Sequence, residues 1–281
     1  MEQNVIEVHE HGFVKLLDIM GNDEEVENSA RISYGEGTRK VSQTRNLIRY
    51  LMRHKHTSPF EMCEVKFHIK LPIFVMRQLV RHRTANLNEY SGRYSVMSDD
   101  FYFPRGDDIK PQSSTNNQGR QEGEISVPTG EAEFEMFRIF DGAQNAYRNL
   151  LEYGVARELS RIVLPVSNYT EVIWKTDLHN FFHFIKLRAD SHAQKEIQDF
   201  ANAMYDLVKP HFPLCCEAFE DYVVNAKTFS KQEMAIIKEH LNYVDDNHMW
   251  TEREDLGVVE HSLSKREQKE FLEKLKIGEM T

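Results

Sequence analysis

The segment from Glu64 to Val80 constrains the fold more than any other part of the chain. Its first half places apolar side chains at every second position: Val65, Phe67, Ile69 and Leu71. Such alternation predicts a β-strand that buries one face. Pro72 then begins a helix at the position where a missing N–H costs least, and apolar residues continue to Val80. A sheet with a helix packed beside it is therefore required.

Weaker patterns predict the other elements. Two strands are expected within residues 5–20 and another over 169–175. Asp23 is expected to cap a helix, and the segments with helical periodicity are 23–33, 40–54, 131–153, 156–164, 178–189 and 192–208. Because strands precede a run of helices instead of alternating with them, we expect an α+β fold in which a mixed sheet packs against helices.

The 281 residues suit one large domain, which we expect to occupy residues 1–224. A segment at about 104–130 has almost no apolar residues or periodicity, so we interpret it as a mobile surface insertion. We expect deletion of 107–123 to leave the fold nearly unchanged. Residues 225–281 read as a helical C-terminal extension, with amphipathic helices at 231–241 and 265–275.

The charge balance narrows the function classes. Acidic residues outnumber basic ones 45 to 35, so the general surface repels nucleic acid. Salt screens exposed charges beyond about 8 Å, so a local basic pocket remains compatible with this balance. Three cysteines make neither a disulfide framework nor a zinc quartet, and no apolar run is long enough to cross a membrane. We expect a cytoplasmic protein without membrane partners.

Positive charge gathers in residues 78–94, which contain Arg81, His82, Arg83 and Arg93. One interpretation is that cations at a helix C-terminus are stabilised by the helix dipole, each by about 0.3–1 kcal/mol. The other is that a polyanion binds here. Three guanidiniums within so short a segment repel one another unless an anion lies between them, which favours the second interpretation.

A second polar segment covers residues 187–194. Asp190 or Ser191 can cap the following helix, but this leaves Arg188 without a role. Arg188 could line a polar cleft with His179 and His183, or these histidines could be ordinary surface or core residues.

Several familiar chemistries are excluded. His54 and His56 are too close in sequence to form a helical metal-binding pair, so no metal is expected. The chain has no Gly-x-Ser-x-Gly nucleophile elbow and no glycine-rich phosphate loop. If a nucleotide binds, arginines hold it.

The arginine segment also carries a family resemblance. Arg81-His82-Arg83, followed after seven residues by Ser91, resembles the signature of the flavin-dependent thymidylate synthases. Four further blocks resemble that family in the same order: 58–61, 91–94, 161–165 and 187–194. The resemblance runs from about Phe13 to about Tyr222.

The resemblance implies an activity. Members of this family methylate dUMP at carbon 5 of uracil, with methylenetetrahydrofolate as carbon donor, bound FAD as hydride carrier and NADPH as reductant. It also implies a homotetramer whose active sites combine residues of several subunits. Phosphate, pyrophosphate and folate carboxylates would explain why an acidic protein concentrates arginines in one segment.

The resemblance also implies site residues. For dUMP these are Gln78, Arg81, Glu89, Tyr90, Ser91, Gly92, Arg93, Arg161 and Arg188. For FAD they are Ser58, Arg81, His82, Arg83, Glu89, Asp177, His179 and His183. Arg188 is the expected catalytic residue, because a guanidinium beside uracil stabilises negative charge on the ring.

Two other functions remain open at this stage. A nucleic-acid-binding protein would use Arg81, Arg83 and Arg93 on backbone phosphates, and a flavoprotein of the same fold would reduce another acceptor. Within the thymidylate synthase interpretation, we expect Ser91 to bind dUMP and not to act as a nucleophile. Its nearest histidine in sequence, His82, lies between two cations that disfavour taking up a proton.

Overall fold

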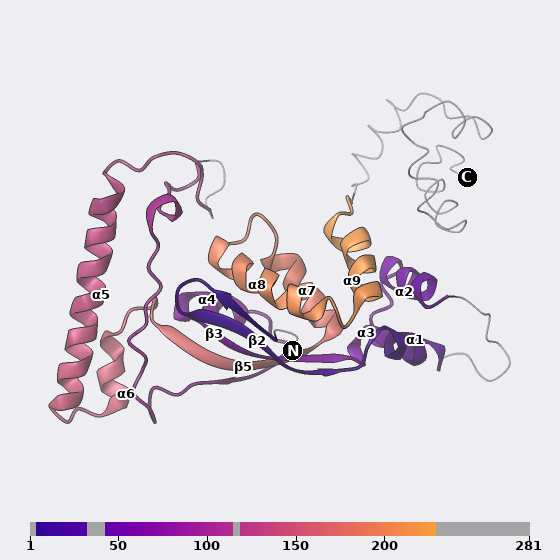
Figure 1. Cartoon of the computed structure of the whole chain (residues 1–281), viewed down its shortest axis with the longest axis horizontal. Coiled ribbons are helices and arrows are strands. Elements are labelled where there is room, and N and C mark those ends of the chain that lie inside the picture. Colours follow the sequence, from indigo (N-terminus) through magenta and orange to yellow (C-terminus); the bar gives the residue numbers. More distant parts are fainter. Residues whose placement is uncertain (1–3, 33–42, 115–118, 229–281) are drawn as a thin grey trace, which may run out of the picture. The chain divides into compact units, whose positions relative to one another are not determined.

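The computed structural model describes residues 4–32, 43–114 and 119–228 (Figure 1). Five strands in these ranges form one sheet in the order β1-β2-β3-β5-β4. Their bounds are β1 Val5–Val8, β2 Gly12–Met20, β3 Glu64–Pro72, β4 Asn86–Glu89 and β5 Tyr169–Asp177. The α+β class is confirmed, but every pairing between these strands is antiparallel, so the expectation of a mixed sheet is wrong.

The helices of the described ranges lie partly over the sheet and partly beside it (Figure 1). Their bounds are α1 Asp23–Arg31, α2 Thr44–Arg53, α3 Ser58–Glu61, α4 Ile73–Leu79, α5 Thr129–Glu152, α6 Arg157–Ser160, α7 Leu178–Arg188, α8 Lys195–Val208 and α9 Pro213–Phe219. Figure 1 shows α7 and α8 lying over the central strands. The rings of Phe67 and Phe181 stack at 5.8 Å, and those of Trp174 and Phe184 lie 5.5 Å apart. This aromatic layer fixes α7 above β3 and β5.

Strand β4 is not among the strands that the sequence predicts. All four of its residues are exposed, so no alternating apolar pattern marks it. It forms because its backbone pairs with β5, with Asn86 opposite Lys175 and Glu89 opposite Val172. The arginine motif therefore precedes one end of this edge strand, and residues 90–93 follow its other end.

Asp23 does not cap the helix it begins. Asn22 is the N-cap of α1 and accepts a hydrogen bond from the backbone N–H of Glu25 at 3.0 Å. The Asp23 carboxylate instead accepts from the backbone N–H groups of Leu214 (2.8 Å) and Cys215 (3.0 Å) at the start of α9. It therefore joins the two helices, because it accepts hydrogen bonds from free N–H groups in the first turn of α9.

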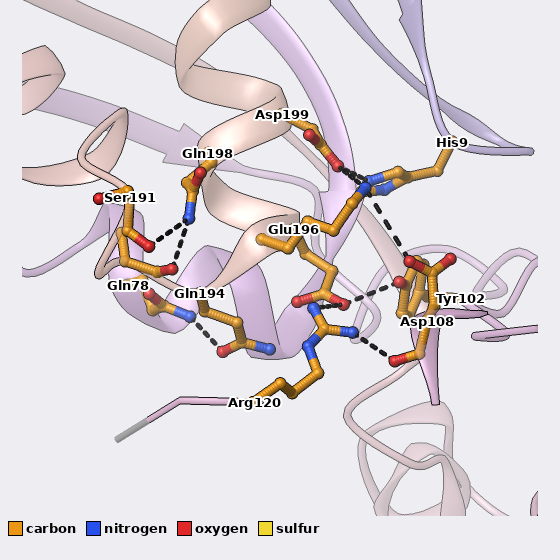
Figure 2. Close-up of polar contacts among 12 residues, drawn as sticks. His9, Gln78, Tyr102, Asp108, Arg120, Ser191, Gln194, Glu196, Gln198 and Asp199 are labelled. Carbon is orange, nitrogen blue, oxygen red and sulfur yellow. Dashed lines mark hydrogen bonds and ion pairs between the residues drawn. The ribbon is translucent and has the colours of Figure 1, made fainter. Parts of the chain in front are cut away.

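The insertion contacts the rest of the domain through a side chain that the sequence pattern does not mark. Arg120 donates through Nη2 to Oε1 of Glu196 at 2.8 Å and through Nη1 to the carbonyl oxygen of Asp108 at 2.7 Å (Figure 2). Ser113 is also buried. The sequence pattern missed this contact because it depends on a single long side chain and not on an apolar stripe.

Some expected elements lie outside the described residues. These are the helices at 231–241 and 265–275 and the first residues, 40–42, of the helix that the structure begins at Thr44. Within the described ranges, no helix is both long and apolar enough to cross a membrane.

Candidate nucleotide site

The arginine motif lines a cavity of about 290 Å³. Arg81, His82 and Arg83 follow α4 directly, because β3 and α4 carry the chain to this edge of the sheet. The other walls come from β5 and α7. The full lining is Arg81, His82, Arg83, Thr84, Trp174, Thr176, Asn180, His183, Leu187 and Arg188. The fold thus brings the two polar segments of the sequence together.

His82 and Arg188 interact directly in this cavity. The Nε of Arg188 donates to Nε2 of His82 at 3.0 Å. Burial, followed by the charges of Arg188 and His183, lowers the pKa of His82 to about 4. His82 is therefore neutral near pH 7 and carries its proton on Nδ1. Its low pKa agrees with the sequence expectation in direction, but the causes are burial, Arg188 and His183 and not the flanking arginines.

The cavity is suited to an anion. Arg81, Arg83 and Arg188 supply positive charge, and no carboxylate belongs to the described lining. Burial, then the charge of Arg81, lowers the pKa of Arg188. Guanidiniums brought together in this way favour a ligand with several anionic oxygens.

Three residues predicted for FAD, on α3 and on or before α7, do not line the cavity. His179 is one turn before His183 on α7, so the two share a helix face. Asp177 is the N-cap of α7 and accepts from the backbone N–H of Asn180 at 2.8 Å and from its side chain at 2.7 Å. Ser58 is exposed at the start of α3, which packs against α7.

A second group of predicted residues lies at the other end of β4. Glu89 accepts a hydrogen bond from the hydroxyl of Thr170 at 2.9 Å. The Ser91 hydroxyl accepts from the backbone N–H of Arg93 at 3.3 Å. Tyr90, 43% exposed, donates to a backbone carbonyl a few residues further on. This loop therefore presents side chains whose positions are partly fixed by local hydrogen bonds.

Arg161 joins the second group. A Cβ added at Gly92 would lie 2.7 Å from Sδ of Met97 and 3.2 Å from Cδ of Arg161, so a larger residue would have to displace these side chains. Arg161 begins the 3₁₀-turn after α6, and Arg93 pairs with Glu158 of α6 at 3.5 Å. Gly92 thus lies against Met97 and Arg161, which places Arg161 beside this loop.

The two groups are well separated within one chain. Thr176 lines the cavity, whereas Thr170 contacts Glu89. Thr170 and Thr176 are six residues apart on β5. At about 3.3 Å per residue, these points are about 20 Å apart. Gln78 occupies a third position, where its Nε2 donates to Oε1 of Gln194 at 2.7 Å. One chain alone does not gather all the residues predicted for dUMP.

Sequence reasoning missed half of the cavity lining: Thr84, Trp174, Thr176, Asn180 and Leu187. Some signals were present. Thr84 follows the arginine motif directly, Trp174 and Thr176 alternate on β5, and Asn180 and Leu187 share helical spacing with His183. These patterns indicate a common face but not that the face borders a cavity.

The cysteines are unsuited to act as nucleophiles. Cys63, Cys215 and Cys216 are all free and buried. Burial raises the pKa of Cys63 to about 11 and that of Cys216 to about 12, and it also raises the pKa of Cys215. Their thiolates are scarce near pH 7. Among the described residues, no cluster of His, Cys, Asp or Glu is arranged to hold a metal ion.

Fold and site together define an α+β protein with an arginine-lined cavity whose charge suits an anionic ligand. A model of the family described as "Thymidylate synthase complementing protein" matches residues 15–214. A flavin-dependent thymidylate synthase of Ehrlichia ruminantium (strain Gardel) is 48% identical over 271 residues, covering 95% of this chain and 87% of the relative. One from Dictyostelium discoideum is 44% identical over 280 residues, covering 97% and 86%.

Solved structures agree with these relatives. A UMP/dUMP methylase, PolB of Streptomyces cacaoi, bound with 5-Br UMP, is 34% identical with a TM-score of 0.68. The match covers 78% of this chain and 98% of that one. The chain therefore belongs to the family of flavin-dependent thymidylate synthases, and it is an enzyme.

Proposed function

We propose that the chain methylates carbon 5 of the uracil ring of dUMP, with bound FAD, methylenetetrahydrofolate as carbon donor and NADPH as reductant. The observation that carries this proposal is the cavity that joins Arg81, His82 and Arg83 to Arg188. The similarity to a methylase bound with 5-Br UMP supports a pyrimidine nucleotide as substrate. The chain's free thiols fit an enzyme of the reducing cytoplasm.

The cavity residues fit FAD. Three guanidiniums without a lining carboxylate suit a pyrophosphate, and a volume of about 290 Å³ accommodates part of a dinucleotide. When bound, FAD supplies hydride transfer to the pyrimidine. The residues proposed to hold it are Ser58, Arg81, His82, Arg83, Glu89, Asp177, His179 and His183.

Arg188 is the proposed catalytic residue. Because its Nε is occupied by His82, the two terminal nitrogens of the guanidinium remain for the substrate. Placed beside the N3–O2 edge of uracil, they stabilise negative charge as the ring is activated. The other residues proposed to bind dUMP are Gln78, Arg81, Glu89, Tyr90, Ser91, Gly92, Arg93 and Arg161.

A homotetramer is part of the proposal. The separation of about 20 Å between Thr176 and Thr170 exceeds the reach of one nucleoside monophosphate. The cavity of one subunit would therefore be completed by the Glu89–Arg93 loop of another. Large apolar side chains support subunit contacts, because each of the following is more than half exposed: Phe134, Phe137, Ile162 and Val166.

The absorbance spectrum of the purified protein tests this proposal. We expect flavin bands that bleach on addition of NADPH and return when dUMP and methylenetetrahydrofolate are supplied. A colourless protein that takes up no FAD would contradict the proposal and favour a nucleic-acid-binding function. A flavin that is reduced and reoxidised without formation of dTMP would identify a flavoprotein with another acceptor.

A further inference from the structure

Strand β5 carries a buried hydroxyl at the edge of the cavity. Thr176 lines the cavity and is 3% exposed. Its Oγ1 donates a hydrogen bond of 2.8 Å to the backbone carbonyl oxygen of Thr84, 92 positions earlier in the chain. A β-branched side chain has few χ1 rotamers, so the direction of this hydroxyl is well defined. The bond ties β5 to the residue directly after the arginine motif.

The backbone of the arginine motif is held unevenly along its length. The backbone N–H groups of Arg81 and His82 donate to carbonyl oxygens in the last turn of α4, at 3.3 and 3.0 Å. The next regular pairing begins at Asn86, where β4 meets β5. Between these two anchors, residues 83–85 make no backbone-to-backbone hydrogen bond within the described part of the chain. The Thr176 hydroxyl therefore holds a span that neither α4 nor β4 fixes.

Arg83 is the residue of the motif that belongs to this span. It lines the cavity together with Arg81 and Arg188, and the three like charges repel one another. Within the described residues, no hydrogen bond or ion pair directs the Arg83 side chain. Its direction therefore depends on its backbone, and repulsion would turn a loosely held Arg83 away from the cavity. A cation that is already in place binds an anion without the entropic cost of ordering it.

We propose that Thr176 is a positioning residue, which holds the Thr84 carbonyl group so that Arg83 stays directed into the cavity, toward the anionic groups of bound FAD. This inference rests on the proposed function, in which Arg83 holds FAD. Thr176 is not among the residues proposed to contact FAD, and it acts through Arg83. Arg81 and His82 do not depend on it, because α4 fixes their backbone.

The FAD affinity of Thr176 variants tests the inference. The dissociation constant is measured from the flavin absorbance that the holoenzyme retains on serial dilution and ultrafiltration. Thr176→Val replaces the hydroxyl by a methyl group, and we expect it to weaken FAD binding about tenfold, because one hydrogen bond is lost. Thr176→Ser keeps the hydroxyl and should bind FAD as tightly as the wild type. If the valine variant does not fold, Thr176→Ala against Thr176→Ser gives the same comparison with smaller side chains.

A double-mutant cycle separates positioning of Arg83 from a purely structural role. When Arg83 is already replaced, as in Arg83→Met, no guanidinium remains for Thr176 to direct. In this background Thr176→Val should change the FAD dissociation constant by less than about twofold, which is the usual error of such a comparison. The same penalty in both backgrounds would show that the hydroxyl does not act through Arg83, and it would overturn the inference.

Ser160→Ala is the matched control. Ser160 is fully buried, and its hydroxyl donates to the backbone carbonyl oxygens of Val155 and Ala156 at 3.1 and 3.2 Å, outside the cavity lining. Its replacement should lower the temperature of thermal unfolding, as Thr176→Val does, but leave FAD binding unchanged. Equal FAD binding by wild type and Thr176→Val would overturn the inference alone, as would weakened binding by Thr176→Ser. A wild type that binds no FAD would overturn the proposed function and the inference with it.

Discussion

Arg188 and His82 are 106 positions apart in the sequence, and one hydrogen bond of 3.0 Å joins them in the cavity. The bond needs a neutral imidazole, because Nε2 accepts only without a proton. It also fixes the guanidinium, since Nε is the donor nearest its attachment to the side chain. Each residue thus determines the chemical state or position of the other.

The first prediction concerns acid stability. The pKa of His82 is about 4 in the folded protein and about 6.5 in the unfolded chain. Between these values the unfolded chain binds a proton that the folded chain does not, so acidification lowers the free energy of unfolding. Above about pH 6.5 this contribution vanishes. Urea denaturation at about pH 7.5 and about pH 5 should show a smaller acid loss in His82→Gln than in the wild type. The same loss in both would contradict the pKa argument.

Ser91→Ala should retain turnover with a KM for dUMP raised about tenfold, because one hydrogen bond is lost. Within the described residues, Ser91 has no histidine or carboxylate as a hydrogen-bond partner, and its hydroxyl accepts from the backbone of Arg93. Removal of a true nucleophile would lower kcat by a factor on the order of 10⁶. Rapid acid quench followed by peptide mapping checks this, and a competent pyrimidine adduct on Ser91 would refute it.

The contact between Arg120 and Glu196 changes what we expect of the insertion. Arg120→Met leaves a buried carboxylate with Tyr102 but without its cation, so the free energy of unfolding should fall by about 1–3 kcal/mol. Arg105→Met, at an exposed position of the same insertion, should change it by less than about 0.5 kcal/mol. Urea denaturation measures both. Equal stability of the two variants would restore the expectation that residues 107–123 are dispensable.

The sequence predicts those elements whose buried face is formed by a regular pattern of apolar residues. Strand β3 was placed within one residue, because Val65, Phe67, Ile69 and Leu71 are all buried on one side. Strand β4 was missed because pairing alone holds it in place, and α9 was missed because it is only two turns long. Boundaries of the long helices shifted by a few residues, as at α8, which begins at Lys195.

The candidate site was predictable only in part. The family resemblance identified Arg81, His82, Arg83, His183 and Arg188, which the cavity gathers. The bond between His82 and Arg188 was not predictable, because it joins residues brought together by β5 and α7. The ion pair between Glu196 and Arg120 was not predictable either, because the two residues are 76 positions apart and each segment contributes only one side chain.

Mixed oligomers test whether subunits share a site. Arg188→Ala damages the cavity and Arg93→Ala damages the loop beyond β4, so each variant alone should be nearly inactive. When the two are co-expressed, about a quarter of the shared sites should contain both intact parts and regain activity. Arg188→Ala mixed with Arg81→Ala is the control, because every cavity remains damaged. Absence of recovery in the first mixture would place the whole site within one chain.

Release of tritium from carbon 5 of labelled dUMP tests the central claim most directly. With FAD-loaded enzyme, NADPH and methylenetetrahydrofolate, we predict tritium release in step with dTMP formation. Arg188→Ala should keep its FAD, but its rate of dTMP formation should fall by a factor of about 10²–10³. Arg188→Lys should recover only part of this rate, because an ammonium lacks the planar fork of a guanidinium. Oxidation of NADPH by the loaded wild-type enzyme without tritium release would contradict the assignment as a thymidylate synthase.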